Sequence, residues 1–160
     1  MSVLFTPGEL FDIAIQIERN GAAFYRKAAA GFTDDAIRAE LESLADMEDD
    51  HEATFAALKE RLTDASDDWF DPDSDAAQYL ESFTSGRIFD VSNAGADVGP
   101  HPTLEAVLRQ AIERERDSVM FYLGMKGFVP ASEGTDKIDS IIRQEMGHIT
   151  ILERRLRAIA

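Results

Sequence analysis

The sequence contains no cysteine. This absence excludes disulfide frameworks, zinc sites built from thiolates, cysteine nucleophiles and an iron–sulfur or rubredoxin-type electron carrier within the chain. A chain of 160 residues is long enough to bury a substantial core without such links. We therefore expect a single domain over residues 1–160.

Basic residues are scarce. The chain has 16 Lys and Arg against 31 Asp and Glu, which gives a formal net charge of -15. This balance argues against nucleic acid and against an anionic membrane as partners, because both attract basic surfaces. Long apolar runs are also missing, since no stretch approaches the roughly 18 residues of a membrane-spanning helix. No targeting segment is recognisable, so we expect a cytoplasmic protein.

Apolar residues recur at intervals of three and four in four segments, and this period predicts an all-α fold with four long helices. Thr6 to Glu9 has the composition of a capping box at a helix start, and Thr33 is expected to cap the second helix. The predicted helices cover about 7–31, 34–62, 103–127 and 132–159. Residues 64–101 hold nine acidic residues and only one base, Arg87, and are expected to form a crossover with a short helix near 74–83.

Each predicted helix has a polar gap in the middle of its apolar stripe. The residues in the gaps are Glu18, then Glu48 with His51, then Glu115, then Glu145 with His148. An unpaired buried carboxylate costs several kcal/mol or becomes neutral. Four carboxylates in one core therefore require a compensating positive charge.

The spacing predicts that these residues share one level of the bundle. Glu18 and Glu48 are 30 residues apart, as are Glu115 and Glu145, so symmetric hairpins turn at Thr33 and Pro130. At about 1.5 Å per residue, each carboxylate then lies roughly 22 Å from its turn and faces its counterpart.

The two halves of the chain are related by a constant offset of 97 residues. Without gaps, residues 6–62 match 103–159 at ten positions, among them Phe24-Tyr25 with Phe121-Tyr122. Tyr25 and Tyr122 lie seven residues after the lone glutamates and so on the same helix faces. We expect them either to donate a hydrogen bond to a ligand carboxylate or to pack in the core alone.

Four carboxylates and two imidazoles are a donor set for two metal ions. In Glu-x-x-His the two side chains lie on one helix face, so one helix offers a carboxylate and an imidazole together. We expect two iron ions, although manganese and zinc also accept these donors. The alternative is a polar network in a metal-free bundle.

These motifs resemble the ferritin-like superfamily, most closely the erythrin domain of rubrerythrin-type proteins, over all four helices. The resemblance implies a di-iron centre that reacts with peroxide or dioxygen, and a homodimer or higher homo-oligomer. Glu18 and Glu115 would be terminal ligands, Glu48 and Glu145 bridging ligands, and His51 and His148 would each bind one metal.

The chain departs from the rubrerythrin pattern in two places. The family carries a further glutamate, used during peroxide reduction, three residues after the ligand of the third helix, where this chain has Ser118. The family's rubredoxin domain needs four cysteines and this sequence has none, so the resemblance implies an external electron donor.

The sequence leaves four functional hypotheses. We expect an oxidoreductase that reduces peroxide or dioxygen as Fe(II) is oxidised, with a role in oxidative stress. The alternatives are a ferroxidase for iron storage or delivery, a dimanganese catalase-like centre, and a non-enzymatic acidic interaction module such as cargo for a larger shell.

Overall fold

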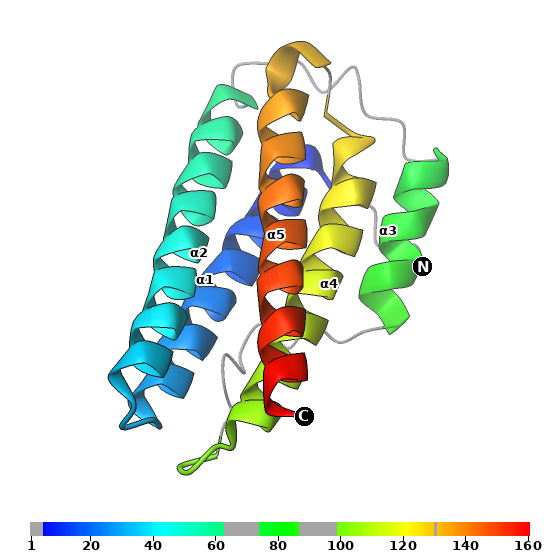
Figure 1. Cartoon of the computed structure of the whole chain (residues 1–160). Helices are drawn as coiled ribbons and strands as arrows, with labels where there is room; N and C mark the ends of the chain where they lie inside the picture. Colours follow the sequence, from blue (N-terminus) through cyan, green and yellow to red (C-terminus); the bar gives the residue numbers. More distant parts are fainter. Residues whose placement is uncertain (1–4, 63–73, 87–98, 130) are drawn as a thin grey trace.

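The computed structural model describes residues 5–62, 74–86, 99–129 and 131–160. Its elements are α1 (Pro7–Ala30), α2 (Asp35–Leu62), α3 (Asp75–Gly86), α4 (Leu104–Lys126), the 3-10 turn η2 (Ala131–Glu133) and α5 (Thr135–Ile159). The four long helices lie side by side, and the short α3 lies beside α4 (Figure 1). This arrangement confirms the expected all-α bundle. Within the described ranges, no helix is long and apolar enough to cross a membrane.

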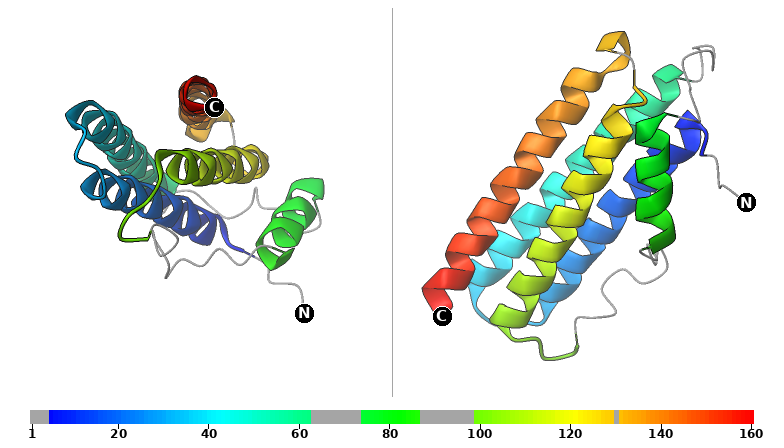
Figure 2. Two further views of the ribbon diagram at one scale, coloured as in Figure 1. Left: turned by 60° about the horizontal axis from the view of Figure 1, so that its bottom comes forward. Right: turned by 90° about the vertical axis from the view of Figure 1, so that its right-hand side faces the viewer.

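The bundle consists of two antiparallel hairpins, α1 with α2 and α4 with α5 (Figure 2). Helices α2 and α4 run in the same direction (Figure 1). The chain that connects the end of α2 to the start of α4 must therefore return along the length of the bundle. The return covers the crossover expected at 64–101, of which the structure describes 74–86 and 99–101. Helix α3 lies in this return and packs against α4.

The start of α1 is capped as the sequence predicts. The Thr6 hydroxyl accepts a hydrogen bond from the Glu9 N–H at 3.3 Å, and the Glu9 carboxylate accepts one from the Thr6 N–H at 2.7 Å. The prediction that Thr33 caps α2 is wrong. Asp34 takes this role, because its Oδ1 accepts a hydrogen bond from the Ile37 N–H at 3.0 Å. A carboxylate also suits the positive end of the helix dipole better than a hydroxyl does.

Helix α5 begins at Thr135, three residues later than the expected start at 132. The delay arises because residues 131–133 form a 3-10 turn and Gly134 has φ 116°, a conformation that ends one helix-like segment before the next begins. A Cβ at Gly134 would also collide with the Leu58 side chain. The predicted break at Pro130 lies outside the described residues.

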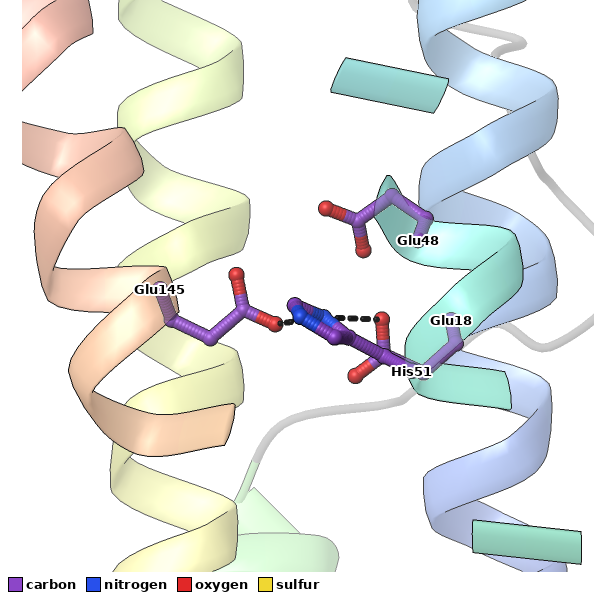
Figure 3. A group of neighbouring side chains, drawn as sticks. All are labelled: Glu18, Glu48, His51 and Glu145. Atoms are coloured by element: carbon purple, nitrogen blue, oxygen red, sulfur yellow. Dashed lines mark ion pairs between the residues drawn. The ribbon is translucent and has the colours of Figure 1, made fainter. Parts of the chain in front are cut away.

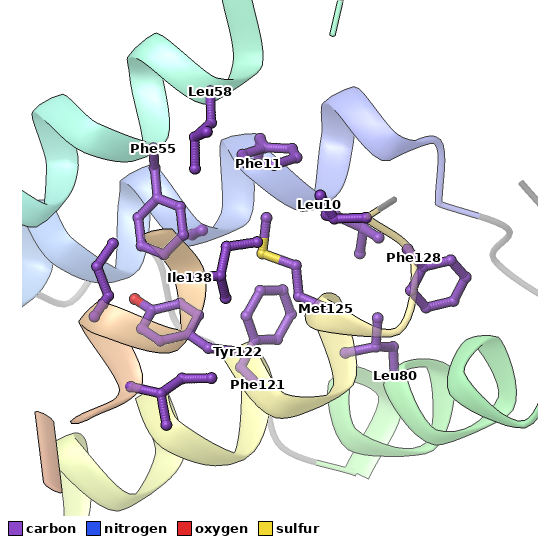
Figure 4. Close-up of a cluster of buried hydrophobic side chains, with 14 of the residues drawn as sticks. Leu10, Phe11, Phe55, Leu58, Leu80, Phe121, Tyr122, Met125, Phe128 and Ile138 are labelled. Atoms are coloured by element: carbon purple, nitrogen blue, oxygen red, sulfur yellow. The ribbon is translucent and has the colours of Figure 1, made fainter. Parts of the chain in front are cut away.

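The core is divided into two apolar clusters, one toward each end of the bundle. The first includes Phe11, Phe55, Leu58, Tyr122, Met125 and Ile138 (Figure 4). The second includes Phe24, Tyr25, Leu41, Leu44, Leu108 and Leu152. Burial of these side chains stabilises the bundle from both ends, and the polar residues singled out from the sequence occupy the level between the clusters.

Candidate metal centre

The structure brings the six predicted ligand residues together in the middle of the bundle. Each long helix contributes to the group, with α2 and α5 supplying two residues each and α1 and α4 one each. None of the six is more than 4% exposed: Glu18 0%, Glu48 4%, His51 3%, Glu115 3%, Glu145 0% and His148 3%. Equal spacing from the two hairpin turns is what places them at one level.

The six residues form two overlapping groups, each with one imidazole. The first group is Glu18, Glu48, His51 and Glu145, and the second is Glu48, Glu115, Glu145 and His148. Within each group, one possible ligand atom from each residue lies within 4.8 Å of those of the others. Glu48 and Glu145 belong to both. The arrangement therefore has two positions that share two carboxylates, with one further carboxylate and one imidazole for each.

Glu145 lies between the two histidines. The Nδ1 of His51 is 2.8 Å from Glu145 Oε1 and 3.5 Å from Glu18 Oε2 (Figure 3). The Nδ1 of His148 is 2.9 Å from Glu145 Oε2. Each oxygen of Glu145 thus faces a different imidazole, and both rings direct Nδ1 toward the carboxylates.

The donor atoms at the centre of the cluster fit a pair of metal ions. Six of them are buried, make no hydrogen bond of regular geometry within the described residues, and approach one another as ion pairs: Glu18 Oε2, Glu48 Oε1, both Glu145 oxygens, and Nδ1 of His51 and His148. No Lys or Arg is found among the buried polar residues of the described part. Carboxylate oxygen and imidazole nitrogen are ligands that iron, manganese and zinc accept. Two divalent cations would balance the four carboxylates and give these atoms partners.

Without metal, the histidines hold protons in its place. Burial lowers the pKa of His51, but Glu145 and Glu18 outweigh this effect and raise the pKa to about 11. Burial likewise opposes protonation of His148, and Glu115 and Glu145 raise its pKa to about 9. Both imidazoles are therefore cationic at neutral pH when no metal is bound.

Three of the carboxylates have shifted pKa values, and the shifts differ in direction. Burial raises the pKa of Glu115 to about 8 against the opposing effect of His148. Burial and the charges of Glu115 and Glu18 raise the pKa of Glu48 well above its ordinary value. The pKa of Glu145 is lowered instead, because His148 and His51 outweigh the effect of burial. The residue between the two imidazoles, Glu145, is thus ionised in the metal-free cluster.

Two tyrosines donate to the cluster from opposite sides. The Tyr25 hydroxyl of α1 donates to Glu115 Oε1 of α4 at 2.5 Å, and the Tyr122 hydroxyl of α4 donates to Glu18 Oε1 of α1. Burial, reinforced by the adjacent carboxylate, raises the pKa of both phenols well above its ordinary value, so both remain donors. For Glu18, this bond holds Oε1 and leaves Oε2 for the centre. Of the two expectations for the tyrosines, the hydrogen bond is the one observed.

The Tyr122→Phe substitution is expected to destabilise the metal-free protein by about 1–3 kcal/mol, because it leaves a buried carboxylate oxygen without its donor. Tyr79→Phe is a matched control, since its hydroxyl donates to the Met120 carbonyl at 3.0 Å on a side chain that is 39% exposed. Urea unfolding of both variants measures the difference. Equal losses of stability would contradict a special role for the buried bond.

Gly21 makes room for a shared carboxylate, a role that the sequence did not reveal. A Cβ at Gly21 would lie 2.8 Å from Glu48 Oε2. The position equivalent to Gly21 at the offset of 97 is Ser118, whose hydroxyl donates to the Arg114 carbonyl at 3.0 Å rather than to the cluster. The space beside Gly21 is therefore occupied by the Glu48 carboxylate. Position 118 contributes no carboxylate to the cluster.

The Gly21→Ala substitution is expected to weaken metal binding about tenfold by displacing Glu48, since residues that position ligands typically contribute factors of this size. The free energy of unfolding of the metal-free protein should change less than the free energy of metal binding. The reason is that Ala favours a helix interior over Gly by about 1 kcal/mol, which offsets part of the displacement. Gly147→Ala is the control, since a Cβ there meets nothing within 4 Å. Chelator competition should show weaker binding in the first variant alone, and equal binding in both would contradict this role of Gly21.

Two further residues contact the cluster from outside it and were not predicted. Gln144 Oε1 lies 2.9 Å from His51 Nε2, and Met47 Sδ lies 3.4 Å from His148 Nε2. Each immediately precedes the glutamate of one Glu-x-x-His motif and reaches the histidine of the other. The internal offset of 97 residues shows that positions 47 and 144 are equivalent. It does not show that each side chain contacts the histidine of the opposite hairpin.

Comparison with known proteins identifies the fold. No protein-family model matches the sequence, and no curated protein is significantly similar to it. The structure is similar to the crystal structure of a Thermotoga maritima protein described as a candidate ferritin-like diiron-carboxylate protein, with a TM-score of 0.71 and 23% identity over 98% of this chain and 97% of that one. Identity this low carries the fold and not the activity. The chain thus has a ferritin-like helical bundle with a buried Glu/His cluster suited to metal ions.

Proposed function

We propose that the cluster binds two iron ions and that the protein is an oxidoreductase coupling Fe(II) oxidation to the reduction of peroxide or dioxygen. The observation that carries the proposal is the overlap of the two donor groups through Glu48 and Glu145. Shared carboxylates would hold two ions close enough to act on one small oxidant together. The fold of the Thermotoga maritima protein supports the proposal.

The residues have distinct roles in this proposal. Glu48 and Glu145 would hold both ions, Glu18 and His51 would complete one position, and Glu115 and His148 would complete the other. When bound, an iron pair supplies two electrons, which with two protons reduce one hydrogen peroxide to two waters. An external donor must then restore Fe(II), because the sequence contains no cysteine for a second redox centre.

The tyrosines and the apolar clusters support the centre in different ways. Tyr25 and Tyr122 fix the orientation of the lone glutamates through their hydroxyl groups. Phe55 packs against the Tyr122 ring at a centroid distance of 4.9 Å and so holds this donor in place. The clusters on both sides keep bulk water from the ligands, which strengthens charge interactions within the site.

A ferroxidase that oxidises iron for storage or delivery is the second candidate. The Ser118 hydroxyl bonds to its own helix, so the site lacks the carboxylate that the rubrerythrin-type resemblance associates with peroxide reduction. This observation favours iron as a substrate that leaves the site after oxidation. The number of Fe(II) ions oxidised per site distinguishes the two functions.

Anaerobic titration with Fe(II) followed by oxidant tests both functions. The proposed oxidoreductase should bind two Fe(II) per chain, and one equivalent of peroxide should oxidise both and then stop until a reductant is added. A ferroxidase should oxidise many Fe(II) per site in air. Binding of other divalent metals with no oxidation of Fe(II) by peroxide or air would contradict both candidates.

A further inference from the structure

The two histidines have similar surroundings on their inner side. Each Nδ1 faces the shared Glu145, and each position has one lone glutamate whose Oε1 accepts a hydrogen bond from a buried tyrosine. The donor atoms available to the two positions are therefore the same in kind and number. The inner contacts differ in detail: His148 Nδ1 lies 3.4 Å from Glu115 Oε1, the oxygen that accepts from Tyr25, and 3.6 Å from Glu48 Oε1. His51 Nδ1 lies 3.5 Å from Glu18 Oε2, the oxygen that is not bonded to Tyr122. A difference in the kind of partner atom is found on the outer side of the rings.

The outer sides of the histidines differ. His51 Nε2 is 2.9 Å from the amide oxygen of Gln144, whereas His148 Nε2 is 3.4 Å from the sulfur of Met47. The amide nitrogen of Gln144 is 3.4 Å from Ser140 Oγ, an arrangement that turns its oxygen toward the imidazole. An amide oxygen is a strong acceptor for an imidazole N–H, and a thioether sulfur is a weak one.

An acceptor at the outer nitrogen changes how well an imidazole binds a metal. It keeps the proton on Nε2, leaves the Nδ1 lone pair for the metal, fixes the plane of the ring and raises its basicity. Both histidines are only 3% exposed, so water adds little to the weak sulfur acceptor beside His148. His51 thus has a strong outer acceptor and His148 a weak one.

We propose that Gln144 is a positioning residue that makes the metal position of His51 the tighter of the two, and that Met47 leaves the position of His148 weaker and more readily emptied. The inference rests on the proposed binding of two metal ions. Its consequence is ordered loading, in which the first ion enters beside His51 and the second beside His148.

Exchange of the two residues tests the proposal. Metal-free protein is titrated anaerobically with Co(II), and the dissociation constants are obtained by competition with a chelator. The wild-type protein should give two constants that differ by about tenfold or more, the usual range for outer partners of a ligand. Gln144→Met should weaken the tighter position and Met47→Gln should tighten the weaker one, each by about tenfold. The double exchange should restore two different constants with the positions reversed.

A spectroscopic readout separates positioning from a general structural effect. With one equivalent of Co(II), the wild-type protein should show one paramagnetically shifted ring N–H, that of His51, protected from solvent exchange by Gln144. Gln144→Met should remove this protection, and Gln144→Glu, which keeps an acceptor oxygen, should restore it. Met47→Leu is the control and should leave both constants unchanged.

The outcomes separate the inference from the function on which it rests. If the wild-type protein binds no Co(II) and no Fe(II), the proposed function fails. If it binds two ions with equal constants that neither exchange alters, the inference fails and the proposed function stands. If the two Co(II) dissociation constants differ and change with the exchanged side chains as predicted, both the inference and the proposed metal binding are supported.

Discussion

The Glu145→Ala substitution is expected to remove both metal ions from the protein. Glu145 is the residue whose two oxygens approach the two imidazoles, at 2.8 Å from His51 and 2.9 Å from His148. It belongs to both donor groups and is fully buried. Its loss leaves each position with one carboxylate fewer and removes one of the two carboxylates that the positions share.

Substitution of a lone glutamate is expected to have half this effect. Glu18 belongs to one group only, so Glu18→Ala should lose one ion and retain the other. Glu42→Ala is the control, since Glu42 is an exposed glutamate on α2. Iron per chain, measured after anaerobic reconstitution and gel filtration, should be near zero for Glu145→Ala, one for Glu18→Ala and two for the control. Two ions retained by Glu145→Ala would contradict the shared role of this carboxylate.

The metal-free protein is expected to lose stability as pH rises from 6 to 9. The pKa values of Glu48, Glu115, His51 and His148 are all raised in the folded state, the last three to about 8, 11 and 9. The folded protein therefore binds more protons than the unfolded chain over this interval, and stability falls with pH wherever that holds. The lowered pKa of Glu145 acts in the opposite sense, but its contribution is lost only in acid.

The expected size of the loss is several kcal/mol, which corresponds to a decrease of about 10 °C in Tm for a chain of this length. Thermal unfolding of chelator-treated protein at pH 6, 7.5 and 9 measures it. Metal-loaded protein should not show this decrease, because the ions take the place of the protons. Glu115→Gln, whose side chain at 115 does not titrate, should show a smaller decrease of Tm with pH. A metal-free stability that stays level or rises over this interval would contradict the assigned protonation.

The level of the cluster and the two hairpins could be predicted from the sequence because they depend on regular geometry. The equal spacing from Glu18 to Glu48 and from Glu115 to Glu145 requires only a constant rise per residue. The Glu-x-x-His pairs require only that residues three apart share a face. Both relations are properties of an ideal helix and need no knowledge of its neighbours.

The details that the sequence did not predict depend on contacts between helices or on local turn geometry. Glycine is needed at position 21 because Glu48 of the neighbouring helix occupies the space beside it. Gln144 and Met47 act on the histidine of the opposite hairpin, a relation that periodicity within one helix does not contain. The cap at Asp34 was missed because Thr33 and Asp34 are both good capping residues, and only backbone geometry selects one.

Metal content is the most direct test that the six residues form a dinuclear iron centre. Protein purified from iron-supplemented cells is analysed for iron, manganese and zinc beside the Glu48→Ala and His148→Ala variants. We predict about two iron ions per chain in the wild-type protein and a marked loss in both variants. Less than about one metal ion per chain, with the same content in the variants, would contradict the assignment of the centre.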